Sequence, residues 1–562
     1  MEKKLLDDLA FLYGSETAPE VHSDLQAIMM KYRARTSARD GGVTERDAIL
    51  ITYGDQVQRP EEAPLKTLAE FCRGHLKDVV SGIHILPFYP WTSDDGFSVM
   101  DYREIDPALG EWDDVTAMRG DFRLMFDAVV NHISAQSDWF RKFLQDDPHY
   151  KDYFIVVDGE PNLSQVVRPR ALPLLTPFQT PSGVKKVWTT FSDDQVDLNF
   201  QNPAVLLEII DILLMYAERG ADFIRLDAIA YLWKQIGTPC IHLPQTHRVI
   251  QLMRAVFDEV APHVGLITET NVPHADNISY FGDGANEAQM VYNFALPPLT
   301  LHTFHTGDAR ILSDWADSLT LPSDKTTFFN FLASHDGVGL NPARGILSDA
   351  DIDSLVGTTL AHGGLISYKH NADGSQSPYE MNINYFDALS NPQGDEPLTL
   401  QVDRFIAAQA VMLALVGMPG IYFHSLFGSR GWLEGVKQTG RNRTINRQKC
   451  NVDTIQRELA DPASLRSHVF SRYRELLSAR GRSPAFHPHG GQKVLDLHKS
   501  VFALERISPD GSARVLCLCN VSADAVTLDA PFESAKDMMT GNTVSGRVLS
   551  LEPYQILWIA RP

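Results

Sequence analysis

The sequence has few cysteines and a shortage of positive charge. Its five cysteines are scattered through 562 residues, and an odd, scattered set argues against a disulfide framework. Lys and Arg number 50 against 71 for Asp and Glu, which gives a formal net charge of -21. A surface that negative repels phosphate backbones and anionic lipid, so we expect neither a nucleic acid nor a membrane as partner.

Long hydrophobic runs are also missing. No stretch of about 18 apolar residues is present that could span a membrane. The first residues, MEKKLLDDLAFLYG, interrupt their apolar positions with acids and lack the core of a signal peptide. The sequence therefore predicts a cytoplasmic protein.

Short apolar runs that alternate with helical patterns are abundant. Runs covered on both faces are near-continuous in apolar residues, as in a parallel sheet. Asn202 and Pro203 form a helix start, with a capping residue followed by proline, ahead of AVLLEIIDILLMYAER. The eight runs predict a (β/α)8 TIM barrel with its active site at the carboxyl ends of the strands; they begin at Ala48, Gly82, Arg123, Asp222, Val264, Met290, Thr327 and Met418.

Two connections are too long for simple loops, and the end of the chain differs in texture. We assign residues 1–133, 201–340 and 401–484 to the barrel, with inserted segments at 134–200 and 341–400. Long insertions at this end of a barrel usually help to build the substrate site. In the last part, SVFALERI, the turn Pro509-Asp510-Gly511 and ARVLCLCNV indicate a hairpin, so residues 485–562 are predicted to form an all-β domain.

Charged residues follow several of the predicted strands. Each alone is more often a turn former, a cap or a structural ion pair. Together they put a carboxylate at the end of four different strands, where they would raise one another's pKa without evident structural benefit. The set that we single out comprises Asp94, Phe97, Asp127, Asn131, His132, Arg225, Asp227, Glu269, His335 and Asp336.

This chemistry matches retaining glycosyl transfer. That reaction needs a carboxylate nucleophile and a carboxylic acid about 5–5.5 Å apart across the anomeric carbon. Asp227 suits the nucleophile because Arg225, on the same strand face, would keep it ionised. Glu269 suits the acid/base. Phe97 and Tyr231 offer apolar faces to a sugar ring.

The motifs FDAVVNH, IRLDA, ITETN and FLASHD resemble, in order, those of the α-amylase superfamily. Within it, DDGFSVMDYREID, RPRALPLLTPF and INR resemble the sucrose phosphorylase group. LPFYPWTSDDGFSV and SYFGDGANEAQMVY are most similar to the glucosylglycerate phosphorylases of that group. The resemblance covers nearly the whole chain.

The resemblance implies roles for individual residues. Asp227 falls on the nucleophile position, Glu269 on the acid/base and Asp336 on the transition-state stabiliser. Positions that hold the glucosyl ring are matched by Asp94, His132, Arg225, His335 and Arg447. Pocket-lining positions are matched by Phe97, Phe191, Gln195 and Tyr231, and loop positions linked to phosphate or acceptor binding by Arg170 and Tyr379. The loop of about 340–380 departs from sucrose phosphorylase in length and sequence.

The resemblance also implies which small molecules take part. Asn131 matches a calcium-ligand position of many amylases, but the phosphorylase group generally lacks that ion, so no metal is predicted. No cofactor is predicted either, since inorganic phosphate serves as a co-substrate. The expected partners are a sugar and phosphate, and the chain is expected to be a monomer or homodimer.

The expected reaction is reversible phosphorolysis of glucosylglycerate to α-glucose 1-phosphate and glycerate by double displacement. Phosphorolysis of sucrose or glucosylglycerol, hydrolysis of an α-glucoside, and a non-catalytic binding barrel are the alternatives. An anionic acceptor demands a nearby cation, which a neutral sugar does not. Arg170 is the first candidate for a basic pocket that binds phosphate. Arg430, Lys369 and Arg344 are the candidates for a cation that binds the glycerate carboxylate, and each could equally be a solvated loop charge.

Overall fold

Eight parallel strands close into a barrel. The computed structural model describes residues 2–36, 42–169, 172–371 and 375–561. Each predicted run contains one barrel strand, and neighbours in the ring are paired in parallel register, which confirms the barrel. In ring order the strands are β1 (Ile49–Thr52), β3 (Gly82–Ile85), β4 (Arg123–Ala128), β9 (Phe223–Leu226), β10 (Gly265–Thr268), β11 (Met290–Tyr292), β12 (Thr327–Asn330) and β16 (Met418–Tyr422).

Helices surround this ring. The predicted start of α6 is confirmed, because the Asn202 side chain accepts a hydrogen bond from the Ala204 N–H and Pro203 is the first helical residue. None of the helices in the described ranges is long and apolar enough to cross a bilayer. Outside the two insertions, the α-helices between barrel strands in the described ranges are α3 (Pro64–His75), α4 (Trp112–Met118), α6 (Pro203–Glu218), α7 (Pro244–Val260), α8 (His274–Ile278), α9 (Leu296–Thr306), α10 (Arg310–Ser318) and α13 (Leu398–Ala414).

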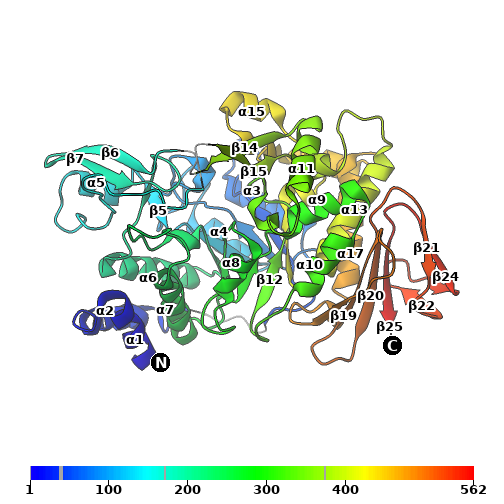
Figure 1. Cartoon of the computed structure of the whole chain (residues 1–562), viewed down its shortest axis with the longest axis horizontal. Helices are drawn as coiled ribbons and strands as arrows, with labels where there is room; N and C mark the ends of the chain where they lie inside the picture. The colour runs from blue at the N-terminus through cyan, green and yellow to red at the C-terminus, as the bar shows by residue number, and fades with distance from the viewer. Residues whose placement is uncertain (1, 37–41, 170–171, 372–374, 562) are drawn as a thin grey trace.

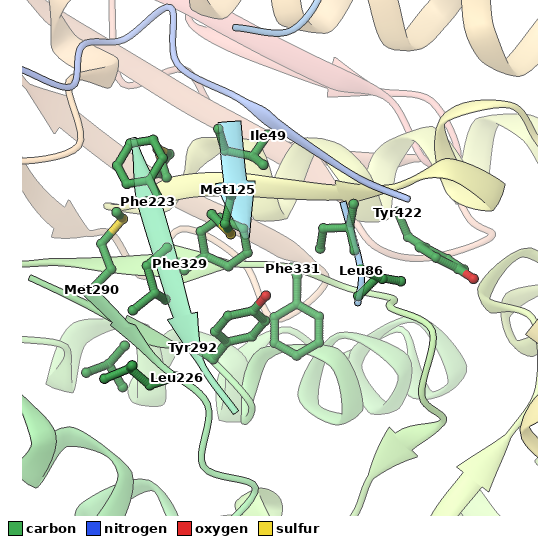
Figure 2. Close-up of a cluster of buried hydrophobic side chains, with 14 of the residues drawn as sticks. Ile49, Leu86, Met125, Phe223, Leu226, Met290, Tyr292, Phe329, Phe331 and Tyr422 are labelled. Atoms are coloured by element: carbon green, nitrogen blue, oxygen red, sulfur yellow. The ribbon is translucent and has the colours of Figure 1, made fainter. Parts of the chain in front are cut away.

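Large apolar side chains fill the barrel around the amino-terminal halves of its strands (Figure 2). Phe223, Met290 and Phe329 lie together there, beside Met125 and Ile49. Two glycines make room for the rings: a Cβ at Gly420 would lie 2.4 Å from the ring of Phe329, and one at Gly265 would lie 2.9 Å from that of Phe223. The polar side chains of the candidate site lie at the opposite end, at the carboxyl ends of the strands.

Both insertions leave from carboxyl ends of barrel strands. After β4 come β5 (His132–Ser134), α5 (Asp138–Leu144), the hairpin of β6 (Leu175–Thr180) and β7 (Gly183–Trp188), and β8 (Gln195–Asp197), which pairs with β5. After β12 come β13 (Val338–Gly339), α11 (Asp349–Ala361), β14 (Leu365–His370), β15 (Gln376–Asn382) and α12 (Tyr385–Leu389). In Figure 1 the hairpin β6–β7 and the strands β14 and β15 lie along the upper side of the molecule.

The two ends of the chain flank the barrel (Figure 1). Helices α1 (Glu2–Tyr13) and α2 (Ala18–Tyr32) pack against α7 and α6. The last part of the chain is all-β, and the predicted hairpin is the antiparallel pair of β19 (Val501–Ile507) and β20 (Arg514–Asn520). The other strands there are β18 (Gly491–Val494), β21 (Val526–Asp529), β22 (Ser534–Asp537), β23 (Thr543–Ser545), β24 (Val548–Leu551) and β25 (Ile556–Arg561).

Short elements complete the segment between β16 and the C-terminal sheet. They lead into α17 (Leu465–Arg480), which packs on α13. All five cysteines are buried free thiols, as their scattered placement predicts. The short elements are α14 (Phe423–Leu426), α15 (Leu433–Thr439), β17 (Cys450–Asn451), which pairs with β2 (Val57–Gln58), and α16 (Val452–Ala460).

Candidate active site

A column of hydrogen-bonded ionisable side chains runs through three neighbouring strands at the mouth of the barrel. His84 Nε2 lies 2.6 Å from Asp127 Oδ2. The other oxygen of Asp127 accepts a hydrogen bond of 2.5 Å from Nη1 of Arg225, and the same nitrogen donates to Asp227 Oδ1 at 2.7 Å. Arg225 and Asp227 are two residues apart, so they point to the same side of the chain. The column fixes the carboxylate of Asp227 from below.

Glu269 stands beside this column, directly after β10. Its Oε2 accepts a hydrogen bond of 3.0 Å from the backbone N–H of Ala228, and its Oε1 lies 3.9 Å from Nη2 of Arg225. Ala228 has a left-handed backbone with φ of 48°, a conformation that costs energy for a residue with a Cβ. That turn directs the N–H of the residue after Asp227 towards Glu269.

The pKa values of both carboxyl groups are raised. Burial raises the pKa of Asp227 well above its usual range, and the opposing effect of Arg225 does not cancel the rise. Burial also raises the pKa of Glu269, helped by the negative charge of Asp336. The prediction that Arg225 keeps Asp227 ionised therefore has the correct sign but omits the cost of burial. Arg225 favours the ionised form of Asp227 more than that of Glu269, because its nitrogens lie 2.7 Å from Asp227 Oδ1 and 3.9 Å from Glu269 Oε1.

Asp336 follows β12 and lies among cations. Nη1 of Arg443 is 2.5 Å from its Oδ1, and Nη2 of Arg447 is 3.4 Å from the same oxygen. Burial alone would raise the pKa of Asp336, but Arg443, His335 and Arg447 together hold it below its usual range. Burial lowers the pKa of His335 to about 3, so this imidazole is neutral at physiological pH. Asp336 is thus an ionised carboxylate beside a neutral histidine.

Aromatic rings and hydrogen-bonding groups form the walls. The rings of Phe97 and His335 stack with their centroids 4.7 Å apart and an interplanar angle of 1°. His132 Nε2 lies 2.9 Å from the carbonyl oxygen of Phe97, which also accepts a hydrogen bond of 3.0 Å from the Gln195 amide. Phe191 contacts His132, with ring centroids 5.1 Å apart. These contacts tie the first insertion to the barrel mouth.

A pocket opens between these groups. Arg225 lies beneath it and bonds Asp227, while Arg447 lies behind Asp336 and donates to the carbonyl oxygen of His335 at 2.9 Å. Arg170 lies outside the described residues. The predicted site residues that line the pocket are Asp94, Phe97, His132, Phe191, Gln195, Asp227, Tyr231, Glu269, His335, Asp336 and Tyr379.

The other predicted candidates for an acceptor cation do not line this pocket. Arg430 pairs with Asp387 at 2.7 Å and donates to Gln401 at 2.7 Å, so it fixes α12 and α13. Lys369 donates to Asn341 at 3.2 Å, and Arg344 donates weakly to the carbonyl of Pro378 at 3.4 Å.

Sequence reasoning missed Arg443 and its partner Glu380. Nε and Nη2 of Arg443 donate to the two carboxylate oxygens of Glu380, at 3.0 and 2.6 Å. Arg443 lines the pocket, but in the sequence it is one of three arginines within GRNRTINR. His84 was also missed, although a histidine within the apolar run GIHIL was the available signal.

Asn131 accepts a hydrogen bond of 2.8 Å from the buried ammonium group of Lys234, which also pairs with Asp197 at 2.5 Å. A cationic side chain thus already contacts the residue that matches a calcium ligand in amylases. Within the described ranges, no group of three or more His, Cys, Asp or Glu side chains is placed to hold a metal ion. The ionisable groups that line the pocket are mainly carboxylates, imidazoles and the guanidinium of Arg443.

Comparisons with known proteins agree with this geometry. Residues 75–337 match the model of the α-amylase catalytic domain. A protein named glucosylglycerate phosphorylase from Spirochaeta thermophila is 52% identical over 574 residues, covering 98% of this chain and 97% of the relative. A protein named sucrose phosphorylase from Agrobacterium vitis is 31% identical over 78% of this chain and 88% of its own length.

A solved structure supports the fold alone. The crystal structure of sucrose 6F-phosphate phosphorylase from Thermoanaerobacter thermosaccharolyticum superposes with a TM-score of 0.74 at 24% identity, covering 91% of this chain and 99% of that chain. The predicted architecture, a barrel with a C-terminal all-β region, is therefore confirmed.

Proposed function

The chain belongs to the α-amylase family, within its group of glucosylglycerate and sucrose phosphorylases, and we propose that it catalyses the reversible phosphorolysis of glucosylglycerate. The products are α-glucose 1-phosphate and glycerate. Relatives named for this activity are 44–52% identical over nearly the full chain, and a sucrose phosphorylase is only 31% identical. It is an enzyme of the glycosyltransferase type.

The observation that carries the mechanism is the position of Asp227 and Glu269 on one pocket above one arginine. In the first step, Asp227 attacks the anomeric carbon while Glu269 gives its proton to the departing glycerate oxygen. The bond from sugar to glycerate breaks and a β-glucosyl ester of Asp227 forms. Because the attack comes from the face opposite the leaving group, this step inverts the anomeric centre.

In the second step, phosphate takes the place of glycerate. A phosphate oxygen attacks the anomeric carbon, the ester bond to Asp227 breaks, and Glu269 accepts a proton when the attacking phosphate carries one. A second inversion returns the α configuration, so α-glucose 1-phosphate is the product. Asp336 stabilises the positive charge of the flattened ring, while His132, His335 and Asp94 bind sugar hydroxyls.

An acceptor panel in the reverse direction tests this function. The enzyme is supplied with α-glucose 1-phosphate and, in separate reactions, glycerate, fructose, glycerol or no acceptor, and phosphate release is measured. We expect glycerate to give the fastest release. Faster release with fructose or glycerol would make the chain a sucrose or glucosylglycerol phosphorylase, and equal release with water alone would make it a hydrolase.

A further inference from the structure

One cation faces the pocket among its described lining residues, and it is Arg443. The pocket also holds the carboxyl groups of Asp94, Asp227, Glu269 and Asp336. A group of this kind repels an incoming anion at short range. Both phosphate and a glycerate carboxylate are anions, so a nearby positive charge is needed before either can reach the anomeric carbon.

Arg443 lies on the route by which an acceptor would enter. A wider outer cavity adjoins the pocket and shares with it Asp94, Pro169, Gln195, Tyr379 and Arg443. The side chain of Arg443 is 25% exposed. It therefore contacts both the chamber where chemistry occurs and the one from which acceptors come.

The guanidinium group is held in place before any ligand binds. Glu380, only 1% exposed on β15, accepts two hydrogen bonds from Nε and Nη2 of Arg443. Nη1 contacts Asp336 at 2.5 Å. A guanidinium has five N–H donors, so these contacts leave two for a ligand. Arginine suits this purpose because its planar donors match both carboxylate and phosphate oxygens.

We propose that Arg443 is the anion-binding residue of the acceptor subsite, where it binds the glycerate carboxylate in one direction of the reaction and phosphate in the other. The two anions use the same guanidinium in turn because each must reach the same face of the same anomeric carbon. This inference rests on the proposed function and needs no contribution from Arg170.

Kinetics of Arg443→Ala test the proposal. Loss of a hydrogen bond to a charged group predicts a rise of about 10- to 100-fold in KM for phosphate and, in the reverse direction, a comparable rise in KM for glycerate. Arg441→Ala is the matched control, since Arg441 is exposed and lines only the outer cavity. A larger effect of Arg441→Ala than of Arg443→Ala on these two constants would overturn the assignment.

A neutral glucosyl donor, used without an anionic acceptor, distinguishes two roles of Arg443: binding an anion and holding Asp336 in place. Hydrolysis of α-glucosyl fluoride without phosphate uses the catalytic carboxylates but no anionic acceptor. We expect Arg443→Ala to lower kcat/KM for phosphate by a factor about ten times larger than the factor by which it slows this hydrolysis. An equal reduction of both rates would show that Arg443 acts only through Asp336, and the proposal would fail.

A charge-neutral pair covers the case in which Arg443→Ala does not fold, because it leaves Glu380 buried without a partner. Arg443→Gln combined with Glu380→Gln retains an amide pair and should still weaken phosphate and glycerate together. Unchanged KM values in this double variant would contradict the proposal. The acceptor panel on the unaltered enzyme tests the function itself, so failure of Arg443 as the anion site is distinguishable from failure of the proposed function.

Discussion

Two groups of buried arginines show how this chain uses the same side chain differently. At the barrel mouth, Arg225 and Arg447 pair with carboxylates. At the contact of α17 and the C-terminal sheet with the base of the barrel, Arg480 and Arg506 donate to backbone carbonyls, among them those of residues 413, 414, 417, 486, 487 and 491.

The difference appears in their titration. Burial lowers the pKa of Arg480 to about 10, and burial together with Arg480 lowers that of Arg506 to about 9. Burial also disfavours the charge of Arg225, but Asp127 and Asp227 raise its pKa well above the usual value. Carbonyls satisfy a donor and fix two segments together, whereas carboxylates hold a charge that chemistry can use. The arginines at the barrel mouth therefore contribute to activity, and those at the base contribute to stability.

The largest expected effect is on activity at the mouth. Asp227→Asn removes the nucleophile, and we expect the rate of phosphorolysis to fall by about 10³-fold or more. The thermal unfolding temperature should not fall, because the change removes a carboxylate whose charge is costly when buried. Phosphorolysis rates and calorimetry on the same preparation check this. A variant that keeps most of its activity would remove Asp227 from the nucleophile role.

The second expected effect is on stability at the base. Arg480→Met leaves the carbonyls of Asp47, Leu413, Gly417 and Phe486 without this donor, so the free energy of unfolding should fall by about 3–5 kcal/mol. Activity per folded molecule should be unchanged. Arg482→Met, at an exposed position two residues along, is the control. Denaturant unfolding measures both, and equal stabilities would contradict the contrast.

The third expected effect is a shift in the pH dependence of kcat/KM. Formation of the glucosyl-enzyme needs protonated Glu269, so kcat/KM should fall as pH rises through the pKa of Glu269. Asp336 raises that pKa, and Asp336→Asn should therefore move the alkaline limb to lower pH. The pH profile of the residual activity measures the shift. Movement to higher pH would show that Asp336 does not act on Glu269 as a negative charge.

The smallest effect is a gain in stability. The folded-state pKa of Glu269 is raised, so its ionised form costs stability once the pH exceeds the unfolded value of about 4.3. Glu269→Gln removes that cost and should stabilise the protein by about 0.5–1 kcal/mol at neutral pH. The gain should vanish as the pH falls below about 4. Unfolding curves at neutral pH and below about pH 4 measure this gain. A loss of stability at neutral pH would contradict the account.

The barrel was predictable because its signal is local. Each strand is a short apolar run with turn residues beyond it, and charges such as those of Asp227 and Glu269 follow directly. Parallel strands place their carboxyl ends on the same rim, so the clustering of these groups follows from the fold alone.

Arg443 was not predictable because its environment is not local. Its role depends on Glu380, which is 63 residues away in the sequence and lies on a strand of the second insertion. Arg441, Arg443 and Arg447 are close neighbours in the sequence, and only packing decides that Arg443 enters the pocket. Likewise, burial raises the pKa of Asp227 against the effect of Arg225. That burial depends on all the segments packed at the barrel mouth and not on the IRLDA motif.

Trapping the covalent intermediate tests the central claim most directly. Glu269→Gln is mixed with α-glucosyl fluoride, whose leaving group needs no acid, in the absence of phosphate, and the quenched protein is mapped by mass spectrometry. The account predicts one glucosyl group on Asp227 that disappears on addition of phosphate with release of α-glucose 1-phosphate. A glucosyl group on another side chain, or release of the β-anomer, would contradict it.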